Sequence, residues 1–175
     1  MAVATRYTSV MTFARLMLFF PIVVALHNAD EIRGYDEFAA AFHPRLNPRL
    51  RSRRIFVVAA WVITAAAALL AFANYAYSIP ALQFVARSAV GALLINALGH
   101  CAISVVKHRL VPGTATALVI VFPYSALALL GTHSDLAANA YPLLGYAALA
   151  ALMLPVATIA SLLIGYAIVS VYNRR

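Results

Sequence analysis

Residues Ile55 to Ser78 read IFVVAAWVITAAAALLAFANYAYS, a run of 24 residues without one charged side chain. A helix rises about 1.5 Å per residue and needs about 20 apolar residues to cross the hydrocarbon core of a bilayer. The run is therefore long enough to span a membrane as one helix. It predicts an integral membrane protein.

The composition of the whole chain supports this prediction. Of the 175 residues, 65% are hydrophobic and 10% are charged, and the mean hydropathy is +0.90. An average soluble domain is about half apolar and about a quarter charged. We therefore expect a single membrane-embedded helical domain over residues 1–175. The net charge of +8 does not indicate a nucleic-acid partner, because the basic residues cluster between apolar runs.

Four further apolar stretches predict an all-α bundle of about five transmembrane helices. The first is the weakest, because Arg15 interrupts it and Pro21 is expected to bend it. A cleaved signal peptide is its alternative, although no small-x-small cleavage site follows. The last is long for one crossing, so we expect it to tilt, kink at Pro155 or project into water. The predicted helices are Ser9–Glu31, Ile55–Ser78, Ala81–Val106, Thr114–Gly131 and Tyr141–Tyr172.

The positions of the basic residues predict the orientation. With five crossings, the link between the first two helices, the link after the third and the C-terminus share one side, and they carry most of the Lys and Arg. Cytoplasmic loops are enriched in these residues. We expect the N-terminus outside and the C-terminus in the cytoplasm, in the cell inner (plasma) membrane. Arg6, Arg15 and Arg87 fall on the outer half, where they are expected to snorkel outward.

The link at residues 32–54 is basic and partly amphipathic. Its segment Tyr35 to Phe42 mixes acidic and apolar residues in the manner of a helix lying on the membrane surface. Pro44 and Pro48 then interrupt regular helix. The arginines from Arg45 to Arg54 are expected to contact anionic lipid headgroups, and no nucleic-acid site is expected.

Polar residues inside two apolar helices are the functional candidates, since such groups are costly in a bilayer. The first helix ends with His27, Asp30 and Glu31. At about 100° per residue, the two carboxylates lie to either side of the imidazole. The third helix carries a polar residue at every fourth position, a stripe that should face other helices rather than lipid. Its members include Asn96, His100 and Ser104.

Depth in the membrane connects the two helices. His27 precedes Arg33 by six residues and His100 precedes Lys107 by seven, so both imidazoles lie about 10 Å inside the cytoplasmic boundary. Imidazole and carboxylate together are ligands of divalent transition metals such as zinc, iron or manganese. We predict a metal site of His27, Asp30, Glu31 and His100, with Glu31 and Asp30 as catalytic candidates and Asn96 and Ser104 lining the site.

These elements also resemble a known family. The motifs His27-x-x-Asp30-Glu31, Asn96-x-x-x-His100 and Pro112-Gly113 are similar to those of the HXXEE domain family, small multi-pass bacterial membrane proteins. The resemblance runs from the first helix to the fourth. Asp30 stands where the family pattern has its first Glu, a shorter carboxylate that shifts any ligand geometry. The family has no established activity to carry over, so the resemblance implies the site rather than a function.

Three interpretations of the polar residues remain open. A metal-dependent site would act on a lipophilic or membrane-delivered small molecule from the cytoplasmic side. A small transporter, proton relay or accessory membrane subunit would use the same groups without catalysis. The residues could also serve only as hydrogen-bonding glue between helices. A serine or cysteine hydrolase is not expected, because no Gly-x-Ser-x-Gly motif appears.

Overall fold

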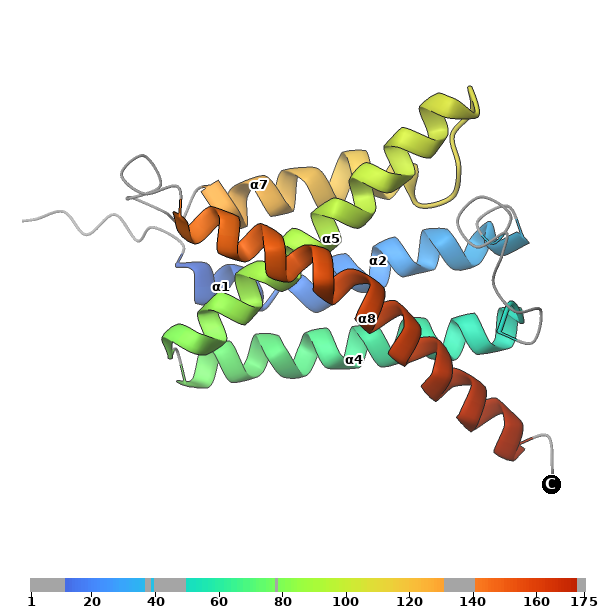
Figure 1. The fold of residues 1–175 in the computed structure, drawn as a ribbon, viewed down its shortest axis with the longest axis horizontal. Helices are drawn as coiled ribbons and strands as arrows, with labels where there is room; N and C mark the ends of the chain where they lie inside the picture. Colours follow the sequence, from blue (N-terminus) through green and yellow to red (C-terminus); the bar gives the residue numbers. More distant parts are fainter. Residues whose placement is uncertain (1–11, 37–38, 40–49, 78, 131–140, 173–175) are drawn as a thin grey trace, which may run out of the picture.

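Every predicted apolar stretch forms a helix in the computed structural model, which describes residues 12–36, 39, 50–77, 79–130 and 141–172 (Figure 1). No strand occurs among these residues, so the all-α prediction is confirmed. The predicted bounds agree with the observed ones to within a few residues. The elements are α1 (Phe13–Met17), α2 (Phe20–Arg33), α4 (Arg53–Tyr77), α5 (Pro80–Val106), α6 (Thr114–Thr116), a π-helical turn (Ala117–Val121), α7 (Phe122–Leu130) and α8 (Tyr141–Tyr172).

Four helical stretches are long and apolar enough to cross a membrane: Phe13–Arg33, Arg53–Tyr77, Pro80–Val106 and Leu144–Tyr172. The stretch Thr114–Leu130 is shorter, at 17 residues or about 25 Å. It runs from within the bundle toward the end at which α8 begins (Figure 1). Membrane location is therefore supported by the four long apolar stretches.

Proline has different effects in the first and last helices. The first helix breaks at Leu18 and Phe19, and Pro21 then occupies the first turn of α2, where its fixed φ and missing N–H are tolerated. The expected bend is thus a break just before the proline. By contrast, α8 continues as one helix through Pro155 and runs obliquely across the other helices (Figure 1).

Small residues let the long helices approach one another closely. The face of α4 that meets α8 includes Ala59, which is buried. A Cβ added at Gly165 of α8 would lie 2.7 Å from the carbonyl oxygen of Ile55, so only glycine permits this crossing. Close backbone approach at small residues is the usual way in which membrane helices associate.

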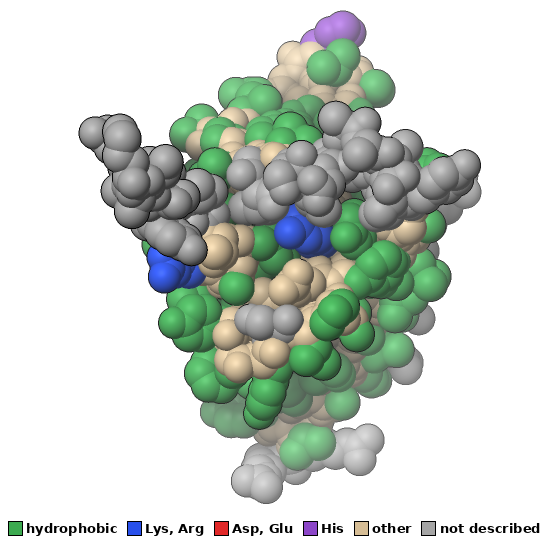
Figure 2. All heavy atoms as spheres, turned by 90° about the vertical axis from the view of Figure 1, so that its left-hand side faces the viewer, with side chains coloured by type: hydrophobic (Ala, Val, Ile, Leu, Met, Phe, Trp, Pro, Cys, Tyr) green, Lys and Arg blue, Asp and Glu red, His purple; other side chains and the backbone are tan. Residues whose placement is uncertain are grey.

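The lipid-facing surface is apolar, as a bilayer requires. Exposed side chains such as Trp61, Leu69 and Phe72 project from α4. The end of the molecule that faces the viewer in Figure 2 shows mostly hydrophobic side chains and few basic ones. The described basic residues of the two links that are predicted to be cytoplasmic lie at the other end, where α2 and α5 end and α4 begins (Figure 1).

Arg87 departs from the expectation that it snorkels outward. Its side chain is buried, with the guanidinium carbon 4.0 Å from the centre of the Phe13 ring. A cation over an aromatic face gains electrostatic energy in a dry environment. Packing on Phe13 therefore holds the guanidinium within the bundle. Arg15, in contrast, is exposed.

The link after α2 is anchored on α4 where the structure describes it. Tyr35 is buried, its ring lies 5.0 Å from that of Phe56, and its hydroxyl donates to the carbonyl of Arg51. Most of the predicted amphipathic segment and the arginines from Arg45 to Arg49 lie outside the described residues.

We predict that the two ends of the bundle face opposite sides of the membrane. Single cysteines at Ser52, just before α4, and Ile79, between α4 and α5, should react with an impermeant thiol reagent from opposite sides. Both are made in a Cys101→Ala background, which alone should not be labelled. Labelling of Ser52→Cys only from the cytoplasm is the expected result, and labelling of both variants from one side would contradict the topology.

Candidate metal centre

Three buried side chains from two helices converge on one point. His27 and Glu31 lie one turn apart on α2, and His100 lies on α5. His100 Nε2 is 2.7 Å and His27 Nε2 is 3.3 Å from the same oxygen, Glu31 Oε1. The two imidazole rings meet edge to face with their centres 5.0 Å apart, as expected from their equal depth.

The three side chains have the chemistry of a metal centre. One ligand atom from each lies within 4.8 Å of the others, and all three residues are buried. Tetrahedral ligands about 2.1 Å from zinc are about 3.4 Å apart. The separation of His27 from Glu31 already matches this spacing, and the Glu31 carboxylate would have to move less than about 1 Å from His100 to complete it.

The outer nitrogen of His100 orients its ring. His100 Nδ1 lies 2.7 Å from the carbonyl oxygen of Pro112, which only accepts hydrogen bonds. Nδ1 therefore carries a proton, and in a neutral ring Nε2 presents its lone pair toward Glu31. Such an outer bond to a backbone carbonyl is the usual support of a metal-binding histidine.

The outer nitrogen of His27 is also held, by hydrogen bonds that run through Thr116 to Asp30. Its Nδ1 lies 2.9 Å from Thr116 Oγ1, and that hydroxyl donates to Asp30 Oδ2 at 3.0 Å or to the carbonyl of Gly113 at 3.1 Å. Because the hydroxyl proton is used there, His27 Nδ1 is the donor to Thr116. The Nε2 lone pair of His27 is again left for the centre.

Asp30 is therefore placed differently from our prediction that it is a ligand. It is not part of the group of three. Its Oδ2 accepts from the backbone N–H of Gly113 at 3.1 Å, from that of Thr116 at 3.4 Å and from the Thr116 hydroxyl. A carboxylate that binds a histidine through a hydroxyl supports a metal centre without touching it.

The Pro112-Gly113 turn is wedged between two helices. Gly113 has φ +88°, a backbone conformation that glycine adopts easily. A Cβ there would lie 2.4 Å from His100 Cε1, and one on Gly34, just after α2, would lie 2.2 Å from Pro112 Cγ. The turn thus fixes α2, α5 and the start of α6 at the site.

Thr116 and Pro112 are the site residues that sequence reasoning missed. Thr116 is followed directly by the π-helical turn Ala117–Val121, a deviation that often occurs at functional sites. A single threonine in an apolar stretch does not by itself indicate a functional residue. The Pro-Gly pair followed by Thr-x-Thr was the sequence feature that could have indicated a turn at the site.

Ser104 supports the turn rather than the centre. Its Oγ accepts from the backbone N–H of Val111 at 3.0 Å and lies 2.7 Å from Thr114 Oγ1. The predicted stripe therefore has two functions: its outer part holds the turn, and Asn96 and His100 reach the centre. His108, the next residue of the stripe, is exposed.

The family comparison covers the residues of the candidate centre. A model of a protein family described as "protein of unknown function with HXXEE motif" matches residues 18–128. This span is more than half of the chain and contains every residue of the centre. The chain belongs to the HXXEE family. No curated protein and no solved structure matches it.

The two acidic positions of the HXXEE motif have separate tasks in this member. The last one, Glu31, faces both histidines, and the one before it, Asp30, faces Thr116 and Gly113. Successive residues of a helix point about 100° apart, so one carboxylate reaches the centre and its neighbour reaches the turn. The HXXEE motif thus places a candidate ligand beside a residue that binds the Pro112-Gly113 turn.

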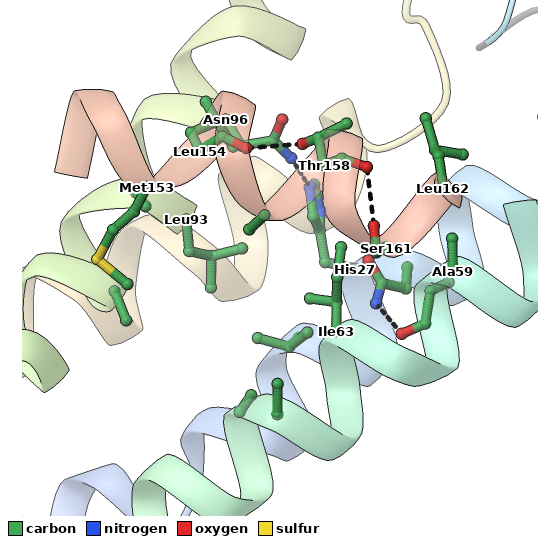
Figure 3. A pocket seen from close by; sticks show the side chains of 18 of the residues that line it. His27, Ala59, Ile63, Leu93, Asn96, Met153, Leu154, Thr158, Ser161 and Leu162 are labelled. Carbon is green, nitrogen blue, oxygen red and sulfur yellow. Dashed lines mark hydrogen bonds between the residues drawn. The ribbon is translucent and has the colours of Figure 1, made fainter. Parts of the chain in front are cut away.

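A cavity of about 510 Å³ adjoins the centre, between α2, α4, α5 and α8 (Figure 3). His27, Glu31 and Asn96 contribute to its wall, and most of the remaining lining is apolar. On α8, the hydroxyls of Thr158 and Ser161 donate to backbone carbonyls of their own helix. Figure 3 shows Leu93 and Met153 on the side of the cavity away from these polar groups.

Proposed function

We propose that this protein is a membrane-embedded, metal-dependent protein that acts on a lipophilic small molecule. The observation that carries the proposal is the buried group His27, Glu31 and His100 at the wall of an apolar cavity. Buried ionisable groups in a bilayer are expensive and are retained where they serve a function. Structural glue alone would not require two histidines with both outer nitrogens fixed.

The charges of the group favour a cation. Both outer nitrogens donate away from the centre, so neutral rings would point two lone pairs at a carboxylate. His100 Nε2 and Glu31 Oε1, at 2.7 Å, repel each other unless a proton or a metal ion lies between them. Two imidazoles and one carboxylate suit zinc, iron or manganese.

The chain supplies positioning, and a bound metal would supply the electrophile. A divalent ion bound by His27, Glu31 and His100 would polarise a substrate oxygen or activate water. Thr116 and Pro112 hold the two rings in place, and the apolar wall excludes bulk water. In the proposed orientation, in the inner membrane, the centre lies near the cytoplasmic side.

The cavity supports the lipophilic character of the substrate. Its lining is mostly apolar, with alanines such as Ala60 and Ala92 that leave room between the helices. A polar head at His27 and Glu31 with an apolar body toward Leu93 and Met153 fits this gradient of polarity. Ligand pockets commonly combine apolar walls with a few fixed polar groups.

Elemental analysis of protein purified in detergent tests the proposal. We expect about one zinc, iron or manganese ion per chain, or uptake of one on titration after treatment with a chelator. A wild type that holds no metal and takes up none would reject the metal-dependent function.

A proton relay, in a transporter or an accessory subunit, is the second candidate. It is favoured by the continuous contacts from Asp30 through Thr116 and His27 to Glu31 and His100. Histidine and carboxylate chains are the usual carriers of protons through membrane proteins. The absence of metal uptake would favour this alternative.

A further inference from the structure

The side-chain amide of Asn96 lies at the middle of the candidate metal centre. Its Nδ2 is 3.0 Å from His27 Nε2, 3.4 Å from Glu31 Oε1 and 3.4 Å from His100 Nε2. All three atoms are those that would bind a metal ion. A hydrogen-bond donor thus faces the point toward which the ligand atoms converge.

This position suits the centre without a metal. The amide NH₂ has two hydrogens, which satisfy the lone pair of His27 Nε2 and one from Glu31. The 2.7 Å separation of His100 Nε2 from Glu31 Oε1 requires a proton between them when no metal is bound. A bound cation would replace that proton, and the amide hydrogens of Asn96 would then face a positive charge.

The amide oxygen of Asn96 can face the centre if the amide group turns over. Asn96 lies in the cavity wall, and Figure 3 shows its oxygen turned away from His27. No hydrogen bond to Oδ1 is found among the described residues. The two ends of an amide have nearly the same shape, and the terminal torsion has a broad energy minimum. Turning the group by about 180° therefore requires little repacking.

We propose that Asn96 is a reversible fourth ligand. Without metal its NH₂ group holds His27 and Glu31 together, and with metal the amide turns and Oδ1 binds the ion. The proposal rests on the proposed metal centre and completes it, because zinc usually takes four ligands.

The fourth position also connects the metal to the cavity. Asn96 contributes to both, whereas His100 does not line the cavity. A neutral amide oxygen binds a metal more weakly than a carboxylate does. An oxygen-bearing headgroup in the cavity would then displace Asn96 and take its place, which makes Asn96 the exchangeable ligand.

Two substitutions separate a ligand from a donor. Asn96→Asp supplies an oxygen ligand and no donor, whereas Asn96→Leu supplies neither. If Asn96 binds metal through oxygen, Asn96→Asp should bind cobalt(II) at least as tightly as wild type, and Asn96→Leu should bind it about 10-fold or more weakly. The visible spectrum of cobalt, which depends on coordination number, should change in Asn96→Leu only.

The stability of the same variants provides a second readout. Because aspartate cannot donate to His27, Asn96→Asp should unfold at a lower temperature than wild type without metal and at an equal or higher one with it. If Asn96 were purely structural, the difference in unfolding temperature between Asn96→Asp and wild type would not change sign when metal is added. Asn28→Asp is the matched control, since Asn28 also lines the cavity but donates to Ala60 and Thr64.

The outcomes distinguish the two proposals. Equal weakening of cobalt binding in Asn96→Asp and Asn96→Leu would show a donor role and overturn the fourth ligand. Wild-type affinity and spectrum in both variants would also overturn it, while the metal centre itself would stand. A wild type that takes up no cobalt would overturn both.

Discussion

Replacing Glu31 by glutamine is expected to weaken metal binding by more than about 100-fold while the protein stays folded. The substitution removes the only carboxylate of the group but keeps its shape. A glutamine whose Nε2 takes the place of Oε1 donates to the lone pair of His100 Nε2, so the shortest buried hydrogen bond survives, while the longer one from Asn96 to the same oxygen is lost. Metal content and thermal unfolding in detergent, measured on the same preparation, check both parts.

A control variant and two variants of the other proposed ligands test whether the loss of metal is specific to the site. Asp36→Asn removes an exposed acidic group close by in the sequence and should leave metal content unchanged. His27→Leu and His100→Leu should also lose the metal. His100→Leu should in addition lower stability, because Pro112 loses its donor and Glu31 loses the nearest of its partners. Retention of stoichiometric metal by Glu31→Gln would contradict the assignment of Glu31 as a ligand.

Gly113→Ala is expected to destabilise the protein by about 2 kcal/mol or more and to abolish metal binding. The backbone at φ +88° is unfavourable for alanine, and the new Cβ would lie 2.4 Å from His100 Cε1. The His100 ring must move, which breaks its contacts with Pro112 and Glu31. Thermal unfolding and metal titration of the purified variant measure the two effects.

Gly145→Ala is the matched control for this substitution. A Cβ at Gly145 of α8 would meet Phe84 at 3.4 Å, an ordinary contact, and alanine is a better helix former than glycine. This variant should therefore match or slightly exceed the wild type in stability and keep its metal. A Gly113→Ala protein with normal stability and metal content would mean that the turn does not position His100.

The sequence was sufficient to predict the helices. Runs such as Ile55 to Ser78 exceed the length needed to cross a bilayer, so hydropathy alone gave all five helices with nearly correct bounds. Arg87 was the exception among the basic residues. Its partner, Phe13, lies on another helix, and no local pattern predicts such a long-range contact.

The candidate centre was predicted in part. The equal depth of His27 and His100 was enough to bring them together with Glu31. The position of Asp30 was not predictable, because it depends on the left-handed backbone of Gly113 and on Thr116 in another helix. Helical periodicity describes the direction of a side chain but not what a distant turn presents to it.

The cavity is built partly from a segment that lies outside the family match, and this affects how such proteins can diversify. All residues of the candidate centre fall within residues 18–128, the stretch that matches the HXXEE model. One wall of the cavity comes from α8, which lies beyond that stretch and contributes Met153, Thr158 and Leu162. Under the proposed function, α8 adds one wall to a cavity whose other walls lie within that stretch, so that substitutions in α8 can alter which molecule is accepted while the candidate metal centre stays intact.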